Sequence, residues 1–282
     1  MATIPYLSGF DVKPLSTSSL GIVTFTDGRD NIRPNQEQCE AYGYTYDKAS
    51  GTCSTFRFNA NLNSSFSNES NKIQGAGNTT ETGTNNTQII GENNTVKGLS
   101  RNNIIVGNQN EIANGVNNAN VYGTLGEATA DNSIILGGNA STDNLAERQS
   151  IHLMYGTQTT AGGTVDSYLN NISGNYFTIP DNSAMYFHAD VLAVRVGGTS
   201  GSGAAGDFLS WVERGVVINK SGTLSIERER DTIKGSGSHT NWRPTATVDG
   251  TNFIIDVRGA ADMTIEWCSN IRFTQIKTGV AL

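Results

Sequence analysis

Residues 94–115 read NTVKGLSRNNIIVGNQNEIANG, and the short motif inside this stretch recurs from residue 71 to residue 123. Most copies place an asparagine first, a β-branched residue two positions later, and a glycine that keeps the same spacing. The asparagines stand 7 to 9 residues apart, at Asn71, Asn78, Asn86, Asn94, Asn103, Asn110 and Asn118. Consecutive copies with all three positions in phase indicate a structural repeat.

This repeat predicts short strands joined by tight turns. Four or five residues form each strand with the branched side chain pointing inward, and Gly and Asn supply the positive φ that the turns require. Stacked turns bring like residues above one another, so we expect the asparagines to form a side-chain ladder. The expected inward residues are Ile73, Val96, Ile105, Ile112, Val121 and Ile134.

The small number of apolar residues in each copy decides the expected oligomeric state. One buried Ile contributes about 2–3 kcal/mol, whereas ordering eight backbone residues costs on the order of 8–16 kcal/mol. A lone chain would therefore have too thin a core, and three chains would place three branched side chains in each layer. We expect a homotrimeric β-helix or β-roll stalk over residues 59–140, with the inward residues on the threefold axis.

On these repeats the chain resembles the stalks of bacteriophage tail fibres and, more loosely, those of trimeric autotransporter adhesins. An adhesin requires a secretory signal, and residues 1–15, MATIPYLSGFDVKPL, contain no charged leader followed by an apolar run. No stretch approaches the roughly 18 apolar residues that span a membrane. We therefore retain the phage resemblance, which implies a virion component assembled in the host cytoplasm.

The C-terminal part predicts an ordinary antiparallel domain. Seven strands are expected between turn signals, at residues 185–195, 208–219, 223–230, 243–248, 252–258, 263–267 and 271–277. This number favours a β-sandwich or jelly-roll knob over residues 181–282, after a transition segment at 141–180 in which residues 144–155 form a short helix or begin a strand. The run DVLAVRVGGT at 190–199 resembles the terminal domain of phage fibre proteins.

Residues 1–58 predict a small region of mixed structure. Residues 34–43, PNQEQCEAYG, indicate a two-turn helix that ends at glycine, and aromatic residues around a turn predict a hairpin after it. Cys39 and Cys53 either form a disulfide across this helix and hairpin or remain two buried thiols. The phage resemblance makes this region the attachment point to another virion protein, a tail adaptor or a capsid protein.

The net charge and the arrangement of the cysteines limit which partners, metals and cofactors we expect the chain to bind. A formal net charge of −7 argues against a nucleic acid or an anionic membrane as the partner. The three cysteines form no Cys-x-x-Cys or Cys/His cluster, so we expect no zinc site, no other metal site and no cofactor. An ion held on the threefold axis by stacked Asn amides is left open.

One polar loop in the C-terminal part is the candidate ligand site. Residues 235–243 read GSGSHTNWR, and His239, Asn241, Trp242 and Arg243 together suit a sugar ring. The tryptophan would stack on the apolar face of the sugar while the polar side chains bind its hydroxyls. The alternative is a Trp242 that folds back onto the sandwich.

A glycan-degrading tailspike would need a pair of carboxylates roughly 5–10 Å apart. The repeat offers almost no carboxylates that could pair, since Glu92 and Glu111 are isolated, and nothing in the sequence pairs the C-terminal carboxylates, which include Asp190, Glu213 and Asp256. We therefore expect no enzymatic activity.

The expected function is that of a trimeric virion fibre whose knob recognises a host-surface glycan or protein. A capsid head fibre or decoration protein is the alternative, and a glycan-degrading tailspike is the third interpretation.

Overall fold

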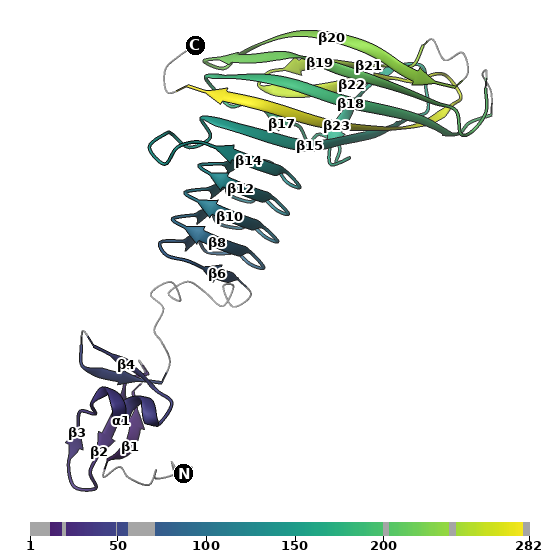
Figure 1. Cartoon of the computed structure of the whole chain (residues 1–282). Helices are drawn as coiled ribbons and strands as arrows, with labels where there is room; N and C mark the ends of the chain where they lie inside the picture. Colours follow the sequence, from purple (N-terminus) through teal and green to yellow (C-terminus); the bar gives the residue numbers. More distant parts are fainter. Residues whose placement is uncertain are drawn as a thin grey trace. The chain divides into compact units, whose positions relative to one another are not determined.

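The computed structural model describes residues 12–18, 21–48, 50–55, 71–199, 203–236 and 241–278. Its elements are almost all β-strands, and the described part of the chain contains one helix, of six residues. No helix in these ranges is long and apolar enough to cross a membrane. Contacts divide the chain into two compact units, Met1–Asn63 and Ser64–Leu282, and Figure 1 labels most of their elements.

The first unit combines a small antiparallel sheet, a helix and a hairpin. Its elements are β1 (Lys13–Thr17), β2 (Val23–Thr26), β3 (Asn31–Ile32), α1 (Gln36–Ala41), β4 (Thr45–Asp47) and β5 (Thr52–Ser54). Asn35 begins the helix, because its Oδ1 accepts a hydrogen bond from Gln38 N–H at 2.8 Å and Gln38 Oε1 accepts one from Asn35 N–H at 3.0 Å. The helix and the hairpin expected from the sequence are both present.

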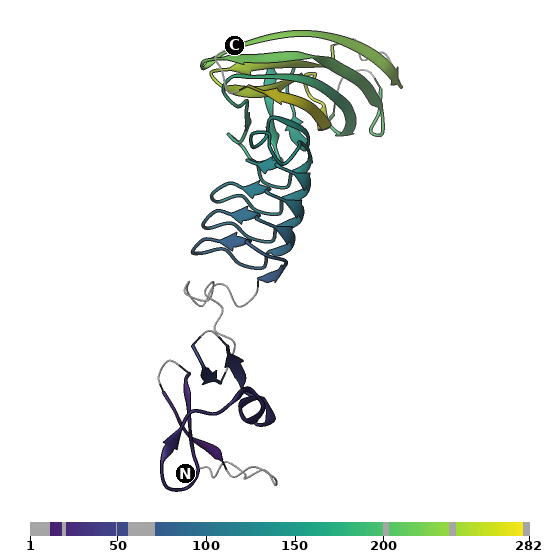
Figure 2. The ribbon, with the colours of Figure 1, turned by 60° about the vertical axis from the view of Figure 1, so that its left-hand side comes forward.

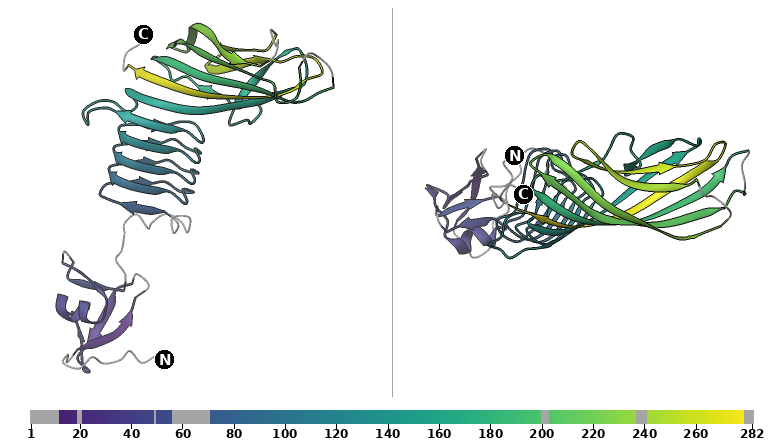
Figure 3. Two further views of the ribbon diagram at one scale, coloured as in Figure 1. Left: turned by 45° about the vertical axis from the view of Figure 1, so that its right-hand side comes forward. Right: turned by 90° about the horizontal axis from the view of Figure 1, so that it is seen from above.

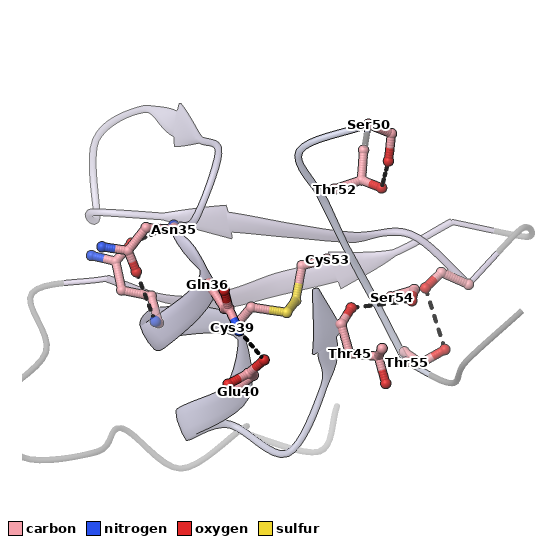
Figure 4. The surroundings of a disulfide bond; sticks show 12 residues. Asn35, Gln36, Cys39, Glu40, Thr45, Ser50, Thr52, Cys53, Ser54 and Thr55 are labelled. Atoms are coloured by element: carbon pink, nitrogen blue, oxygen red, sulfur yellow. Dashed lines mark hydrogen bonds between the residues drawn. A yellow bond between two sulfur atoms is a disulfide. The ribbon is translucent and has the colours of Figure 1, made fainter. Parts of the chain in front are cut away.

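A disulfide joins the helix to the hairpin of this unit. Cys39 lies on α1 and Cys53 on β5, with their Cα atoms 5.8 Å apart and their sulfur atoms bonded (Figure 4). Both residues are buried in a small core with Val23 and Phe25. The two alternatives for this pair are thus resolved in favour of the disulfide, which stabilises a unit too small to build a large core.

The second unit begins with a β-solenoid of about four coils. One side of each coil belongs to a parallel sheet made of β6 (Lys72–Gln74), β8 (Gln88–Glu92), β10 (Ile104–Asn108), β12 (Asn120–Thr124) and β14 (Ile134–Gly138). A second parallel sheet is made of β7 (Thr79–Thr80), β9 (Thr95–Val96), β11 (Glu111–Ile112) and β13 (Glu127–Ala128). Figure 2 shows the coils stacked on one another.

One coil takes up two copies of the sequence repeat. Ile89 pairs with Ile105 and Ile105 with Val121, which is a step of 16 residues, and the last step from Val121 to Ile135 is 14 residues. The two halves of each coil therefore face each other within one chain, and their apolar side chains fill the space between the two sheets.

This arrangement corrects the expected threefold axis. Val96, Ile105, Ile112 and Val121 are fully buried, but they lie inside the coils of a single chain and not between three chains. The estimate of too thin a core was wrong because it counted one repeat, whereas a coil contains two that cover each other.

Two of the expected inward residues are exposed. Ile73 is 39% exposed and lies on the edge strand β6. Ile134 is 44% exposed because the shortened last coil places Ile135, its neighbour, in register with the inward Val121.

The asparagines divide into three columns instead of one ladder. Asn78, Asn94 and Asn110 form a buried column in which each Oδ1 accepts a hydrogen bond from the backbone N–H one coil later. Asn94 N–H donates to Asn78 Oδ1, and Asn110 N–H donates to Asn94 Oδ1, both at 3.0 Å. The next backbone N–H after Asn110 in this column belongs to Gly126 and donates to Asn110 Oδ1 at 2.8 Å.

The other two columns lie at different positions of the coil. Asn71 and Asn103 accept from Thr87 N–H at 3.0 Å and from Ala119 N–H at 2.8 Å. Exposed corners with positive φ, 51° and 57°, hold Asn86 and Asn118. Because the coil is two repeats long, consecutive asparagines of the sequence never stack directly on one another.

Beyond the solenoid the sheet continues without a break. The strand β15 (Arg148–Thr159) pairs antiparallel with β14 and is followed across the sheet by β23 (Thr264–Lys277), β18 (Ser183–Gly197), β19 (Phe208–Lys220) and β20 (Thr223–Gly235). Residues 144–155 thus begin a strand, one of the two forms expected. The two last strands expected from the sequence are the single strand β23.

A smaller sheet forms a second layer, seen in Figure 3. Its strands are β16 (Thr164–Leu169), β17 (Phe177–Thr178), β21 (Arg243–Asp249) and β22 (Asn252–Arg258), with β22 between β21 on one side and β16 and β17 on the other. Phe253 of this layer lies 5.0 Å from Phe187 and 5.0 Å from Phe273 of the large sheet, measured between ring centroids. An aromatic core therefore holds the two layers together.

Candidate functional site

The loop predicted to bind a sugar does not form such a site in the described residues. Trp242 is 3% exposed and belongs to the main hydrophobic core, so its ring is not available for stacking on a ligand. The alternative, a tryptophan folded back onto the strands, describes it correctly. Asn241 and Arg243 are exposed on either side, and His239 lies outside the described residues.

A pocket of about 370 Å³ lies instead where the last coils meet the segment between β16 and β17. Loop residues that follow β11 and β13 form one wall, and residues 175–178 form the other. Apolar side chains, Val116, Leu169 and Phe177, contribute to the lining. Its polar lining residues are Asn114, Thr129, Asp131, Asn175, Tyr176 and Thr178.

Hydrogen bonds hold the pocket walls in place, and one of them joins the solenoid to the segment between β16 and β17. Asn170 Nδ2 donates to the backbone carbonyl of Asp131 at 3.0 Å, and Asn117 N–H donates to Asp131 Oδ1 at 2.7 Å. Asn170 and Asn171 both adopt a φ of 57°, which folds the connecting segment into tight turns. The pocket is therefore held open by local geometry on both sides.

Tyr155 supports the floor of the pocket. It is 1% exposed, its hydroxyl donates to the Phe253 carbonyl at 3.1 Å, and the same oxygen accepts from Phe177 N–H at 2.9 Å. Burial raises the pKa of Tyr155, so the hydroxyl stays protonated. This side chain ties the large sheet to β17 and β22 of the small layer beside the pocket.

Next to the pocket, a tyrosine leads to two carboxyl groups. Tyr176 Oη donates to Asp166 Oδ2 at 2.5 Å, and this hydrogen bond raises the pKa of Tyr176. Asp166 lies opposite Asp256 in the pairing of β16 with β22. Burial, together with the charge of Asp166 and a hydrogen bond to it, raises the pKa of Asp256 to about 6. The ring of Tyr168 lies 5.6 Å from that of Tyr176.

These groups define what the site can do chemically. Hydroxyl, amide and carboxylate groups beside aromatic rings bind polyhydroxylated molecules by hydrogen bonds and ring contacts. A carboxyl group whose pKa is raised can donate a proton to one atom, while a second carboxylate beside it can accept a proton from another or act on the reacting carbon.

Sequence reasoning missed most of this site. Asp131 lies in the repeat, while Asp166 and Tyr176 lie in the segment interpreted as a transition. Of the carboxylates considered from the sequence, Asp256 acquires a carboxylate partner beside the pocket, and it is Asp166. The β-branched and aromatic residues in 164–169 were a usable signal for a strand, but no signal in the sequence indicates that 166 and 256 lie opposite each other.

Glu213, another carboxylate considered from the sequence, is buried between the layers. Arg228 Nη1 lies 3.8 Å and Arg230 Nη1 3.7 Å from its carboxylate oxygens, and burial raises its pKa. Residues 227–231 of β20 read ERERD and form a charged run. Glu229 and Asp231, which alternate with Arg228 and Arg230 in this run, form ion pairs with Arg214 on the outer face. The charged run of β20 thus makes intramolecular ion pairs on both of its faces.

Comparison with known proteins gives distant matches to solved structures alone. No protein-family model and no curated protein matches the chain. The tailspike of Acinetobacter baumannii phage AM24 aligns with 74% of this chain and 49% of its own, at 10% identity and a TM-score of 0.26. The Acinetobacter phage vB_ApiP_P1 tailspike aligns with 74% of this chain and 47% of its own, at 11% identity and a TM-score of 0.23. The tailspike of A. baumannii bacteriophage Fri1 aligns with 72% of this chain and 46% of its own, at 7% identity and a TM-score of 0.23.

These structural neighbours are phage tailspikes, and this chain spans about half the length of each. The Fri1 protein is described as a capsular polysaccharide depolymerase, which is an enzyme. This finding overturns the expectation that enzymatic activity is excluded. TM-scores of this size assign no activity to the present chain.

Proposed function

We propose that the chain is a subunit of a phage virion fibre and that its pocket beside Tyr176 recognises a glycan of the host surface. In this proposal the solenoid is the stalk, the two-layered C-terminal strands are a sandwich knob, and residues 1–58 attach to another virion protein. The sequence resemblance to tail-fibre stalks supports the virion assignment. The pocket, with its aromatic and hydroxyl lining, is the observation that carries the recognition assignment.

The size and lining of the pocket suit one or two sugar units. Ligand sites typically enclose about 300–1,000 Å³ and combine apolar walls with a few placed polar groups. Tyr176 provides apolar ring surface, while Asn114, Asn175 and Thr178 provide hydrogen-bonding groups for hydroxyls. A sugar ring presents the same combination of an apolar face and a polar edge.

Occlusion of the pocket tests this proposal. Thr129 is exposed at the pocket wall, so Thr129→Trp fills the space without disturbing the core. Thr82→Trp, on an exposed turn of the solenoid outside the pocket lining, is the matched control. We expect wild-type chain and Thr82→Trp to bind the surface polysaccharide of a susceptible host in titration calorimetry and Thr129→Trp to lose that binding. Equal binding by all three proteins would reject the pocket as the recognition site.

Glycan cleavage is a second candidate function, favoured by one observation. The Asp166 and Asp256 carboxyls lie beside the pocket, and Asp256 has a pKa of about 6. Cleavage of a glycosidic bond requires a group that protonates the leaving oxygen and a second carboxylate. Release of reducing ends from host polysaccharide by the wild-type chain, and its loss in Asp166→Asn and Asp256→Asn, would establish this activity. Intact polysaccharide after prolonged incubation would reject it.

The proposed fibre is a homotrimer, and an exposed stripe supports this part of the proposal. The outward face of the coil sheet carries one apolar residue per coil in matching register: Ile90, Val106, Tyr122 and Leu136, each 36–47% exposed. A contiguous apolar surface of this kind is typical of an interface. This stripe now replaces the buried residues as the expected contact between chains.

The position of the fibre on the particle distinguishes tail from capsid. A head fibre or decoration protein would have the same solenoid and strands, and its attachment partner would be a capsid protein. Electron cryomicroscopy of intact particles, with density assigned to this chain, decides between a tail and a capsid location.

A further inference from the structure

The lining of the pocket contains no cation. Its polar side chains are two amides, two threonine hydroxyls, the Tyr176 phenol and the Asp131 carboxylate, and no Lys, Arg or His is among the described residues that line it. Asp131 is oriented by two hydrogen bonds that involve its Oδ1 and its backbone carbonyl. Its carboxylate is therefore the charged group that a ligand meets in this pocket.

The surroundings of the pocket add further negative charge. Asp166 accepts the hydrogen bond of Tyr176, Asp256 lies opposite Asp166, and the charge of Asp249 also acts on Tyr176. The charge of Arg228 lowers the pKa of Asp256. The same guanidinium also lies 3.8 Å from the carboxylate of the buried Glu213, which is a second acidic partner for it. The chain as a whole is also acidic, with a formal net charge of −7.

A negatively charged sugar entering this pocket would be unfavourable. Its carboxylate or sulfate would lose water without gaining a cationic partner, and it would be repelled by Asp131. A hydroxyl can donate to the Asp131 carboxylate at no such cost, and an ammonium group would form an ion pair with it. The chemistry of the lining thus discriminates by ligand charge.

We propose that the pocket accepts neutral or amino-bearing sugar units and rejects units that carry carboxylate, phosphate or sulfate groups. This inference rests on the proposed function of glycan recognition and specifies the class of glycan. It makes Asp131 the residue that determines specificity, while Tyr176 and the amides bind features common to all sugars.

Matched trisaccharides test this inference. The probes are galactose, galactosamine and galacturonic acid trisaccharides, titrated into the full chain at low ionic strength. We expect the galactose and galactosamine probes to bind on the order of tenfold more tightly than galacturonate, the scale of one charge contact near a protein surface. Raising the salt concentration should reduce this ratio because screening weakens the repulsion.

Two variants separate a charge effect from a general loss of binding. Asp131→Asn keeps an oxygen that can accept from Asn117 N–H and removes the charge, so it should bind galacturonate several-fold more tightly than wild type does. Thr129→Lys adds a cation at the pocket wall and should have the same effect, whereas Thr82→Lys, away from the lining, should bind like wild type.

The outcomes distinguish failure of the charge selectivity from failure of glycan recognition. Binding of galacturonate as tight as that of galactose, or unchanged selectivity in both Asp131→Asn and Thr129→Lys, would overturn the charge selectivity and leave glycan recognition standing. Failure of the wild-type chain to bind any of the three probes, together with failure to bind host polysaccharide, would overturn both.

Discussion

At the scale of single residues, glycine has a role that no other residue can take at one position of each coil. Gly91 and Gly107 adopt φ of +135° and +136°, and a Cβ on Gly107 would lie 1.9 Å from the carbonyl oxygen of Gly123 in the next coil. Backbone therefore occupies the space in which a side chain would stand. The regular glycines of the sequence mark this close approach as well as a turn.

This contact predicts an unequal effect of two glycine substitutions. Gly107→Ala should lower the free energy of unfolding by about 3 kcal/mol or more, because both the backbone conformation and the contact must change. Gly115→Ala should cost only about 1 kcal/mol, since its φ is +75° but a Cβ would meet nothing within 4 Å. Urea unfolding of the two variants measures the difference, and equal losses would contradict the proposed close approach.

Asp256 predicts how stability depends on pH. Its pKa of about 6 in the folded chain is above the ordinary value of 3.8, so the folded state holds this proton more tightly than the unfolded state does. The stabilisation from this group is complete below about pH 4 and is lost as the pH rises through about 6. Asp256→Asn should therefore flatten the pH profile of unfolding between these values.

Denaturant unfolding at several pH values tests this expectation. Glu266→Gln is the control, because Glu266 is exposed on β23 and its hydrogen-bond partner, the amide of Gln158, carries no titrating group. A profile for Asp256→Asn that matches wild type would show that the two carboxyls do not interact as described.

At the scale of elements, the sequence predicted the parts of the solenoid but not its coil. The inward side chains of Val96, Ile105, Ile112 and Val121 and the turn role of asparagine and glycine followed from their spacing. The coil length did not, because its two halves resemble each other closely enough to give an apparent period near eight. Only strand length separates them, with five residues in β8 and two in β9.

The candidate site was the least predictable part for a related reason. The pocket and the carboxyl pair are formed by residues far apart in the sequence, such as Asp131, Asp166 and Asp256. Their proximity depends on the order of strands in the small layer, which no local pattern encodes. The composition of the loop around Trp242 predicted a sugar site, but the Trp242 ring is buried and therefore cannot stack on a ligand.

The disulfide predicts that removing Cys39 and Cys53 destabilises the first unit and not the second. Cys39 and Cys53 close a sequence separation of 14 residues, and removing such a bond typically costs about 2–4 kcal/mol. The double variant Cys39→Ser/Cys53→Ser should unfold the first unit at a lower temperature, while the transition of the second unit stays where it is. Calorimetric scans resolve the two transitions.

Cys268→Ser is the control for this prediction. Cys268 is a free, exposed cysteine on β23 of the second unit, so its replacement should leave both transitions unchanged. If the first unit unfolds at the same temperature without Cys39 and Cys53 as with them, the disulfide does not stabilise it.

At the scale of the whole molecule, the proposed trimer would form through the apolar stripe of the solenoid. A single chain has a mass of 30.0 kDa, and we expect light scattering to give three times that value. Val106→Lys places a charge in the middle of the stripe and should shift the mass toward that of one chain. Val216→Lys, at a comparably exposed position of β19, should remain trimeric.

A monomeric wild-type chain would reject the trimer while leaving the solenoid intact, because the coils bury their own core. This separation is a consequence of the fold, since the inward residues first expected to hold three chains together are covered within one. Assembly and folding are thus independent questions for this molecule.

The most direct test of the account is a crystal structure of the full chain bound to an oligosaccharide released from host surface polysaccharide. The account predicts a sugar unit in the pocket against Tyr176, with a hydroxyl or amino group on the Asp131 carboxylate. A sugar bound on the outer face of the large sheet or on the first unit, with the pocket empty, would contradict it.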